Sequence, residues 1–197
     1  MIRAAFAALF LSIASVSGAY AADDAPAQKP AEKLSLAEER EAKLDRLFAK
    51  LRKAASPDEA EVSVNAIWQQ WLANDSPTAQ VLLVQATRAM EAKDYKAAHA
   101  ILDPLVEVHP GYMEAWNKRA TLFYLEGRYG ESVKDIAKVL DLEPRHFGAL
   151  AGLGMIRRLQ GDKVGAIRAF RDALAVNPSM PGIKEAIDEM GGEETPI

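Results

Sequence analysis

Cysteine is absent from this 197-residue sequence, and histidine occurs only three times. Without thiols the chain has no disulfide to stabilise it and no sulfur ligand to offer a zinc ion. His99, His109 and His146 do not have the three- or four-residue spacing that places two metal ligands on one helix face. The sequence therefore predicts no disulfide framework and no metal site.

Sequence motifs of catalysis are absent as well. There is no G-x-S-x-G nucleophile turn and no glycine-rich phosphate loop. The glycines from Gly148 to Gly154 lie within a helical pattern with no strand before them, so a dinucleotide-binding loop is excluded. Aspartate and glutamate are scattered at helical spacing, as on a solvated helix face. These absences predict that the protein is not an enzyme and holds no cofactor.

A stripe of basic residues is also missing. The chain has 24 Lys and Arg against 28 Asp and Glu, a formal net charge of −4, with the two signs interspersed. Binding to nucleic acid or to an anionic membrane surface requires clustered positive charge. The sequence therefore argues against both kinds of partner, and recognition of another protein remains.

Residues 1–21 have the pattern of a secretory signal peptide. Arg3 supplies a positive start, Ala4 to Val16 is almost wholly apolar, and the small residues Ala19 and Ala21 frame a cleavage site. An uncleaved membrane anchor is the alternative, but the apolar run is shorter than the ~20 residues that span a bilayer. We expect cleavage after Ala21, export to the periplasm and no membrane insertion afterwards.

Residues 22–34 and 35–76 form the next two predicted segments. The first is rich in alanine, proline and charge, has little apolar surface to bury, and is predicted to be a disordered tether. The second contains two helix starts, a capping box that begins at Ser35 and a Ser-Pro pair that begins at Ser56. We predict a helical hairpin here. Because it fits no repeat signature well, we assign it as an N-terminal cap for the units that follow.

Trp68 and Trp71 on the second of these helices allow more than one interpretation. Together with Val64, Ile67 and Leu72 they form a stripe at helical spacing, which is typical of a helix packed on its neighbour. The pair could instead form an exposed aromatic binding platform, or a seam between two copies of the chain. We take packing as the first interpretation and keep the other two as alternatives.

A 34-residue period organises the sequence from Ala79 onward. Pro110, Pro144 and Pro178 stand one such period apart, and each ends a unit of two predicted helices. Small residues recur where the two helices of a unit would touch, and large apolar residues recur where one unit would meet the next. One unit alone cannot bury its apolar face, so neighbouring units must stack. The small positions are Ala86, Ala120 and Gly154 with Ala98, Ser132 and Ala166; the large ones are Leu82, Trp116 and Leu150 with Leu102, Ile136 and Phe170.

This pattern resembles the tetratricopeptide repeat, whose signature places W, L-G, Y, A, F and P at fixed positions of a 34-residue unit. Three units are expected within residues 77–180, and the resemblance implies an all-α, right-handed solenoid of helical hairpins. A short helix in 181–192 would cap the C-terminal end, and 193–197 would form a loose tail. Pro104 departs from the pattern, because it stands inside an expected helix that it should kink or shorten. The units are residues 79–112, 113–146 and 147–180.

In this family the first helix of each hairpin lines a concave groove, so the resemblance also implies a set of partner-binding residues. Tyr124 and Arg158 are the expected main anchors, because such side chains contribute large contact energies. The Lys and Asn clamp with which some members grip chaperone tails is absent, since other residues stand at the clamp positions: Leu83, Thr87, Gly148 and Gly152. The groove residues transferred from the family positions are Leu83, Thr87, Met90, Asn117, Thr121, Tyr124, Met155 and Arg158.

The layout resembles small periplasmic tetratricopeptide proteins of Gram-negative bacteria, some of which are linked to envelope integrity and complex assembly. That resemblance implies a scaffold that holds a peptide or helix of an envelope protein in its groove. Two alternatives stay open. One is a self-associating structural protein, a homodimer with the Trp68/Trp71 hairpin or the C-terminal helix as its seam. The other is a non-catalytic accessory subunit of a cell-wall enzyme complex. The sequence does not identify the bound protein.

Overall fold

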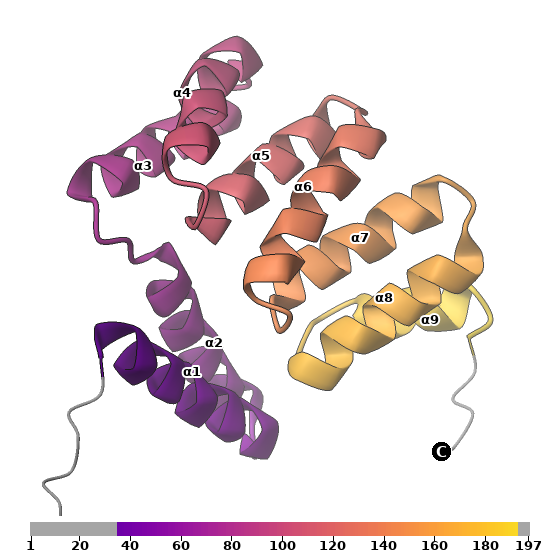
Figure 1. The fold of residues 1–197 in the computed structure, drawn as a ribbon. Coiled ribbons are helices and arrows are strands. Elements are labelled where there is room, and N and C mark those ends of the chain that lie inside the picture. Colours follow the sequence, from indigo (N-terminus) through magenta and orange to yellow (C-terminus); the bar gives the residue numbers. More distant parts are fainter. Residues whose placement is uncertain (1–34, 193–197) are drawn as a thin grey trace, which may run out of the picture. The chain divides into compact units, whose positions relative to one another are not determined.

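The computed structural model describes residues 35–192, and all regular structure within them is helical (Figure 1). The predicted signal peptide, tether and C-terminal tail lie outside the described residues. Over residues 35–192, no helix is both long and apolar enough to cross a membrane. The helices are α1 (Leu36–Lys53), α2 (Pro57–Leu72), α3 (Pro77–Glu91), α4 (Tyr95–Val108), α5 (Met113–Leu125), α6 (Tyr129–Leu142), α7 (Phe147–Leu159), α8 (Lys163–Val176) and α9 (Ile183–Glu189).

The helix starts lie where the capping residues predicted them. The Ser35 side chain accepts from the backbone N–H of Glu38, and the Glu38 carboxylate accepts from the Ser35 N–H at 2.7 Å, so the capping box is confirmed. Ser56 caps α2 in the same manner and is followed by a proline at the first helical position. Ser76 does the same for α3. These local signals mark where α1, α2 and α3 begin.

Three helical hairpins, α3–α4, α5–α6 and α7–α8, follow one another along the chain and in space (Figure 1). The predicted small positions lie inside each hairpin, and Ala86, Ala98, Ala166 and Gly154 are all buried. Their small size permits close approach of the helices, as the pattern indicated. The Ser132 hydroxyl, also buried, donates to the carbonyl of Ala120 at 2.7 Å, so the one polar residue at a small position is satisfied.

The first repeat differs from the others at two places. α4 runs without interruption from Tyr95 to Val108 with Pro104 inside it, so the alternative of a shortened helix is wrong. Lys93 occupies the turn between α3 and α4 with φ of 59°, where the next two turns have Gly127 at 73° and Gly161 at 78°. A side chain at positive φ is strained, and glycine is not.

Lys93→Gly is therefore expected to raise the free energy of unfolding by about 0.5–1 kcal/mol, because relief of the left-handed strain exceeds the added entropy of the unfolded chain. Urea unfolding followed by circular dichroism measures the change. Lys134→Gly, at an exposed position in the interior of α6, is the control and should lower the free energy of unfolding by about 1 kcal/mol, the helix-propensity penalty of glycine. Equal losses in both variants would show that the turn at Lys93 is unstrained.

The hairpin α1–α2 does not pack as a further repeat. Its buried face, which includes Phe48, Ile67 and Trp71, shares a core cluster with Phe147 at the start of α7, and Met113 at the start of α5 packs against the same cluster. The hairpin thus lies against the turns that join one repeat to the next. At the other end of the chain, α9 packs on α8. The capping roles assigned to the two terminal elements stay predictions.

Candidate functional site

A pocket of about 190 Å³ lies between α5 and α7, with α6 contributing to its wall. Its lining is mostly apolar and includes the small residues Ala120, Gly148 and Gly152, which keep the helix surfaces low and so leave room for a side chain from outside. Met155, on the α7 side, is 45% exposed. We call this cavity the groove pocket. It is lined by Asn117, Ala120, Thr121, Tyr124, Ser132, Ile136, Gly148, Ala149, Gly152, Met155 and Ile156.

Four of the eight predicted groove residues meet in this pocket: Asn117, Thr121, Tyr124 and Met155. The Tyr124 ring is partly buried and lies 5.9 Å from the Tyr129 ring, centroid to centroid. The Thr121 hydroxyl donates to the Asn117 carbonyl one turn earlier, so it is held against its own helix. The pocket therefore combines an aromatic wall, a flexible methionine and two polar groups at its rim.

The other four predicted residues lie elsewhere. Leu83 and Met90 are only 3% and 9% exposed and belong to the buried cluster that α3 shares with Ala115 and Leu122 of α5, which corrects their assignment as groove surface. Thr87 is partly buried, and its hydroxyl donates to the Leu83 carbonyl. None of these three lines the groove pocket.

Arg158, one of the two expected anchors, is also outside the groove pocket. It stands near the end of α7, and its guanidinium lies 3.8 Å from the Glu189 carboxylate of α9. This exposed pair is weak. The side chain is nevertheless directed toward α9 rather than toward Tyr124, so the structure does not bring the two predicted anchors together.

A buried polar pair underlies the N-terminal end of the groove. Glu114 and His146 are both fully buried, and the Nε2 atom of His146 lies 2.8 Å from a Glu114 carboxylate oxygen. The Nδ1 atom of His146 accepts from the backbone N–H of Ala149, which caps α7 and leaves the ring proton on Nε2 to be donated to Glu114. Asn117 donates to the other Glu114 oxygen at 3.1 Å. Both ends of the pair are thereby satisfied. Its members are 32 residues apart in the sequence, so spacing alone gives no signal of it.

Trp68 and Trp71 cover this pair. The Trp71 ring stacks on His146, with centroids 4.3 Å apart and an interplanar angle of 14°, and Trp68 meets His146 edge-on at 5.4 Å. The packing interpretation is confirmed. Trp71 is fully buried, so neither an exposed aromatic platform nor an exposed dimer seam formed by both tryptophans agrees with the structure. A Cβ on Gly148, which lines the groove pocket, would lie 3.1 Å from the Trp68 ring.

Arg145 ties α1 to the end of the second repeat. Its guanidinium donates to Glu41 and Asp45 of α1 at 2.6 Å each and to Glu143 at 2.7 and 2.8 Å, and it lies over the Phe48 ring. The hydrogen bonds to Glu143 are the main cause that raises the pKa of Arg145. The contacts with α1 join segments that are distant in the sequence. They hold the hairpin α1–α2 against the end of the second repeat.

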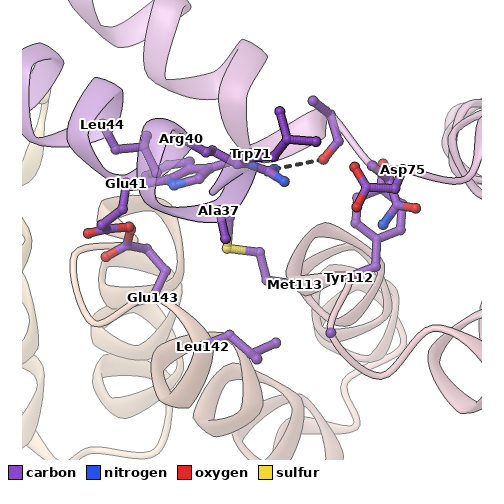
Figure 2. Close-up of a pocket in the computed structure, with 14 residues that line it drawn as sticks. Ala37, Arg40, Glu41, Leu44, Trp71, Asp75, Tyr112, Met113, Leu142 and Glu143 are labelled. Atoms are coloured by element: carbon purple, nitrogen blue, oxygen red, sulfur yellow. Dashed lines mark hydrogen bonds between the residues drawn. The ribbon is translucent and has the colours of Figure 1, made fainter. Parts of the chain in front are cut away.

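A second cavity, of about 290 Å³, lies between the hairpin α1–α2 and the repeats (Figure 2). Residues from α1, from the connection between α2 and α3, from the α4–α5 turn and from the end of α6 line it. Among them, the Tyr112 hydroxyl donates to the Leu72 carbonyl at 2.8 Å, and burial, followed by the nearby charge of Glu114, raises the pKa of Tyr112 to about 12. We call this cavity the hairpin pocket. It is lined by Leu36, Ala37, Arg40, Glu41, Leu44, Trp71, Ala73, Asn74, Asp75, Gly111, Tyr112, Met113, Leu142 and Glu143.

Within residues 35–192, no group of three His, Asp or Glu side chains is placed to hold a metal ion. The two cavities offer apolar surface and a few hydrogen-bonding groups.

Sequence comparison finds the same repeat. The family described as "Tetratricopeptide repeat" matches residues 83–139 and 126–181. A TPR repeat-containing protein of Rhizobium etli is 36% identical over 164 residues, which cover 80% of this chain and 80% of that protein. The small glutamine-rich tetratricopeptide repeat-containing protein 2 of Mycosarcoma maydis is 26% identical over 113 residues, 57% of this chain and 32% of that protein.

Solved structures resemble the fold. The TPR domain of Arabidopsis OM64 aligns with a TM-score of 0.55 at 17% identity, covering 59% of this chain and 96% of that one. The first TPR of Spaghetti (RPAP3), bound to the HSP90 peptide SRMEEVD, aligns with a TM-score of 0.57 at 15% identity, covering 60% of this chain and 94% of that one. At these identities the likeness concerns the arrangement of helices alone.

Proposed function

Because this chain belongs to the tetratricopeptide-repeat family, we propose that it is a protein-binding scaffold of the periplasm that supports the integrity or assembly of the cell envelope. Tetratricopeptide folds typically serve as scaffolds for protein–protein interaction. Here the bound element would be a peptide or helix of an envelope protein, held between α5 and α7. The observation that carries the proposal is the groove pocket, which gathers Asn117, Thr121, Tyr124 and Met155 on one face.

The size of the groove pocket favours a protein segment over a small molecule. At about 190 Å³ it is smaller than the pockets of roughly 300–1,000 Å³ that enclose drug-sized ligands. Its mostly apolar lining suits one large apolar side chain, anchored beside Tyr124, while the rest of the segment runs along the exposed helix surfaces. Gly148, at the start of α7, stands against the Trp68 ring, so we propose that the segment extends toward the C-terminal ends of α5 and α7.

The chemistry of the bound segment differs from that of an acidic chaperone tail. The Spaghetti domain is described with an HSP90 peptide that contains three acidic residues. In this chain Leu83 is buried and Gly148 and Gly152 offer no side chain, so no cationic clamp forms at the corresponding positions. We therefore propose an apolar anchor rather than a terminal carboxylate as the recognised feature.

Tyr124→Ala is expected to weaken binding of the partner at least about tenfold, because it removes an aromatic wall from the centre of the contact. The free energy of unfolding should fall by no more than about 1 kcal/mol, since the ring is only partly buried. Co-purification of crosslinked complexes from Gram-negative cells measures partner retention. Tyr129→Ala is the matched control, because Tyr129 contacts Tyr124 but does not line the pocket. Equal losses in both variants would place the binding site elsewhere.

The periplasmic location proposed here rests on the pattern of residues 1–21. Fractionation of cells that express the full chain, followed by N-terminal sequencing, tests it. We expect the protein in the periplasmic fraction with Ala22 as its first residue. An intact chain in the cytoplasm would remove the envelope role from the proposal, but it would leave the scaffold function untouched.

A further inference from the structure

The exposed side of α1 carries a row of positive charges. Basic residues follow one another there at steps of three or four residues, which places them on one side of the helix. The two signs of charge are interspersed along the sequence, but the turn of α1 sorts them by side, so a local row of cations exists where the sequence predicted none. We call this row the basic stripe. It consists of Lys43, Arg46, Lys50 and Lys53.

The basic stripe has no partner within its own chain as described. All four side chains are exposed, and within residues 35–192 no hydrogen bond or ion pair joins any of them to another residue. Glu41 and Asp45 lie on another side of α1 and accept from the Arg145 guanidinium. Glu39, one turn before Lys43, is the one carboxylate of α1 on the side of the stripe. The stripe therefore keeps an excess of positive charge that faces solvent.

Two surface hollows border the basic stripe, one toward each end of α1. The first, of about 380 Å³, is lined by the first two residues of the stripe and by Leu36, which is 85% exposed. The second, of about 470 Å³, is lined by the last two and by Val62 of α2, which is 70% exposed. Glu59 lines the second hollow as well, and its carboxylate accepts from the Ala55 N–H. This surface thus combines cations with aliphatic groups and with room for side chains of another molecule.

The C-terminal part of the chain carries the opposite charge. Residues 183–194 contain five carboxylates and one lysine. The three carboxylates on α9 are exposed, and of these only Glu189 has an ion-pair partner within residues 35–192, Arg158 at 3.8 Å. We call these five residues the acidic end, of which the last two lie outside the described residues: Glu185, Asp188, Glu189, Glu193 and Glu194.

We propose that the basic stripe of one copy of this chain binds the acidic end of a second copy. Exposed ion pairs are weak one by one, but several that form together between complementary surfaces give specific association. The net charge of −4 makes two copies repel each other at a distance, so they associate only where opposite charges meet. A symmetric dimer through either surface would bring like charges together. The contact is therefore head to tail, α1 of one copy against α9 of the next.

A head-to-tail contact leaves one basic stripe and one acidic end free on every pair, so that further copies can join. The groove pocket is lined from α5, α6 and α7 and takes no part in the contact. An assembly of this kind would therefore present several groove pockets at once, which raises the avidity for a partner with more than one binding segment. The association itself does not depend on the scaffold function proposed above.

Sedimentation of the protein, purified from cells that express the full chain, tests the association. We expect the mean mass to rise with protein concentration in about 20 mM salt, with a dissociation constant on the order of 100 µM, and to return to that of a monomer in about 500 mM salt. A monomer at every concentration in low salt would overturn the proposal. Binding of such a monomer to phosphatidylglycerol vesicles would assign the basic stripe to a membrane surface instead.

Charge reversal on α1 tests which surface is used. Lys43→Glu combined with Arg46→Glu should weaken the association at least about tenfold. Lys134→Glu combined with Lys138→Glu, at exposed positions of α6, changes the net charge by the same amount and is the matched control. Far-ultraviolet circular dichroism checks that both variants are folded. Equal weakening in both would show that only the net charge matters, and it would overturn the proposal.

A mixture of two variants gives the sharpest result. Glu185→Lys combined with Asp188→Lys reverses part of the acidic end and should weaken the association as the reversal on α1 does. When this variant is mixed in equal amounts with the α1 variant, we expect the association to return, because the new glutamates of one chain meet the new lysines of the other. Two folded variants that stay monomeric in the mixture would rule out a contact between α1 and α9.

Discussion

Replacement of Trp71 by alanine lowers the free energy of unfolding by about 3–5 kcal/mol, the range found when a large aromatic side chain is removed from a core. The ring is fully buried, stacks on His146 and contacts Phe48, Trp68 and Phe147. Its loss leaves a cavity and opens the His146–Glu114 pair to water. Urea unfolding followed by far-ultraviolet circular dichroism measures the effect.

Trp116→Ala is the matched control for this prediction. Trp116 is only partly buried, and its N–H donates to a backbone carbonyl near the surface. Trp116→Ala should therefore lower the free energy of unfolding by less than Trp71→Ala does. A loss below about 1 kcal/mol in Trp71→Ala would contradict the packing described here, since surface substitutions fall in that range. A two-step unfolding curve would show instead that α1–α2 separates from the repeats before they unfold.

Gly154→Ala is the second substitution for which we expect a large effect. It should lower the free energy of unfolding by about 1–3 kcal/mol, as overpacking of a core does. A Cβ at this position would lie 2.5 Å from two atoms of the Phe170 ring. That ring is 1% exposed and forms part of the contact between α8 and α9, so it has little room to move. The clash outweighs the gain of roughly 1 kcal/mol that alanine brings to a helix interior.

Gly152→Ala tests the same packing argument, but here we expect the free energy of unfolding to rise. It lies two residues earlier on α7, and its Cβ would meet only the Ile136 side chain at 3.7 Å, an ordinary contact. Helix propensity then dominates, and the free energy of unfolding of the variant should rise by about 0.5–1 kcal/mol. Thermal unfolding of the two variants in one experiment shows whether Gly154→Ala lowers the stability and Gly152→Ala raises it. Stabilisation by both substitutions would mean that Phe170 is free to rearrange.

The repeats could be predicted from the sequence because their signals are local and recur. Small residues at Ala86, Ala120 and Gly154 and a proline at the end of every unit repeat in phase, and each reports on contacts within one hairpin or between neighbours. The structure places these residues as the pattern indicated. Capping residues such as Ser35 and Ser56 are equally local, and they mark the helix starts correctly.

The position of the hairpin α1–α2 against the repeats could not be predicted in this way. Its contacts join Trp71 to His146 and Arg145 to Glu41, which are distant from each other in the sequence, and no period relates them. The stripe of apolar residues on α2 showed that a face was buried, but not against what. Because the hairpin pocket forms between α1–α2 and the repeats, it has no signal in the sequence either.

The groove was predicted only in part, for a physical reason. Family positions were transferred to each repeat alike, although the neighbours of each repeat differ. Leu83 and Met90 on α3 are large apolar residues, and they are buried in the cluster shared with α5, whereas Thr121 and Tyr124 on α5 face the small residues of α7 and stay accessible. The pocket thus forms where Gly148 and Gly152 leave space.

We propose that the space between α5 and α7, the groove pocket, is the binding site through which the molecule works. The most direct measurement is photo-crosslinking in living Gram-negative cells from a benzoylphenylalanine at position 124, with a control probe at Lys138, an exposed residue of α6. We expect a discrete partner protein, identified by mass spectrometry, from position 124 and not from position 138. Capture of the same protein from both positions, or capture only of a second copy of this chain, would contradict the account.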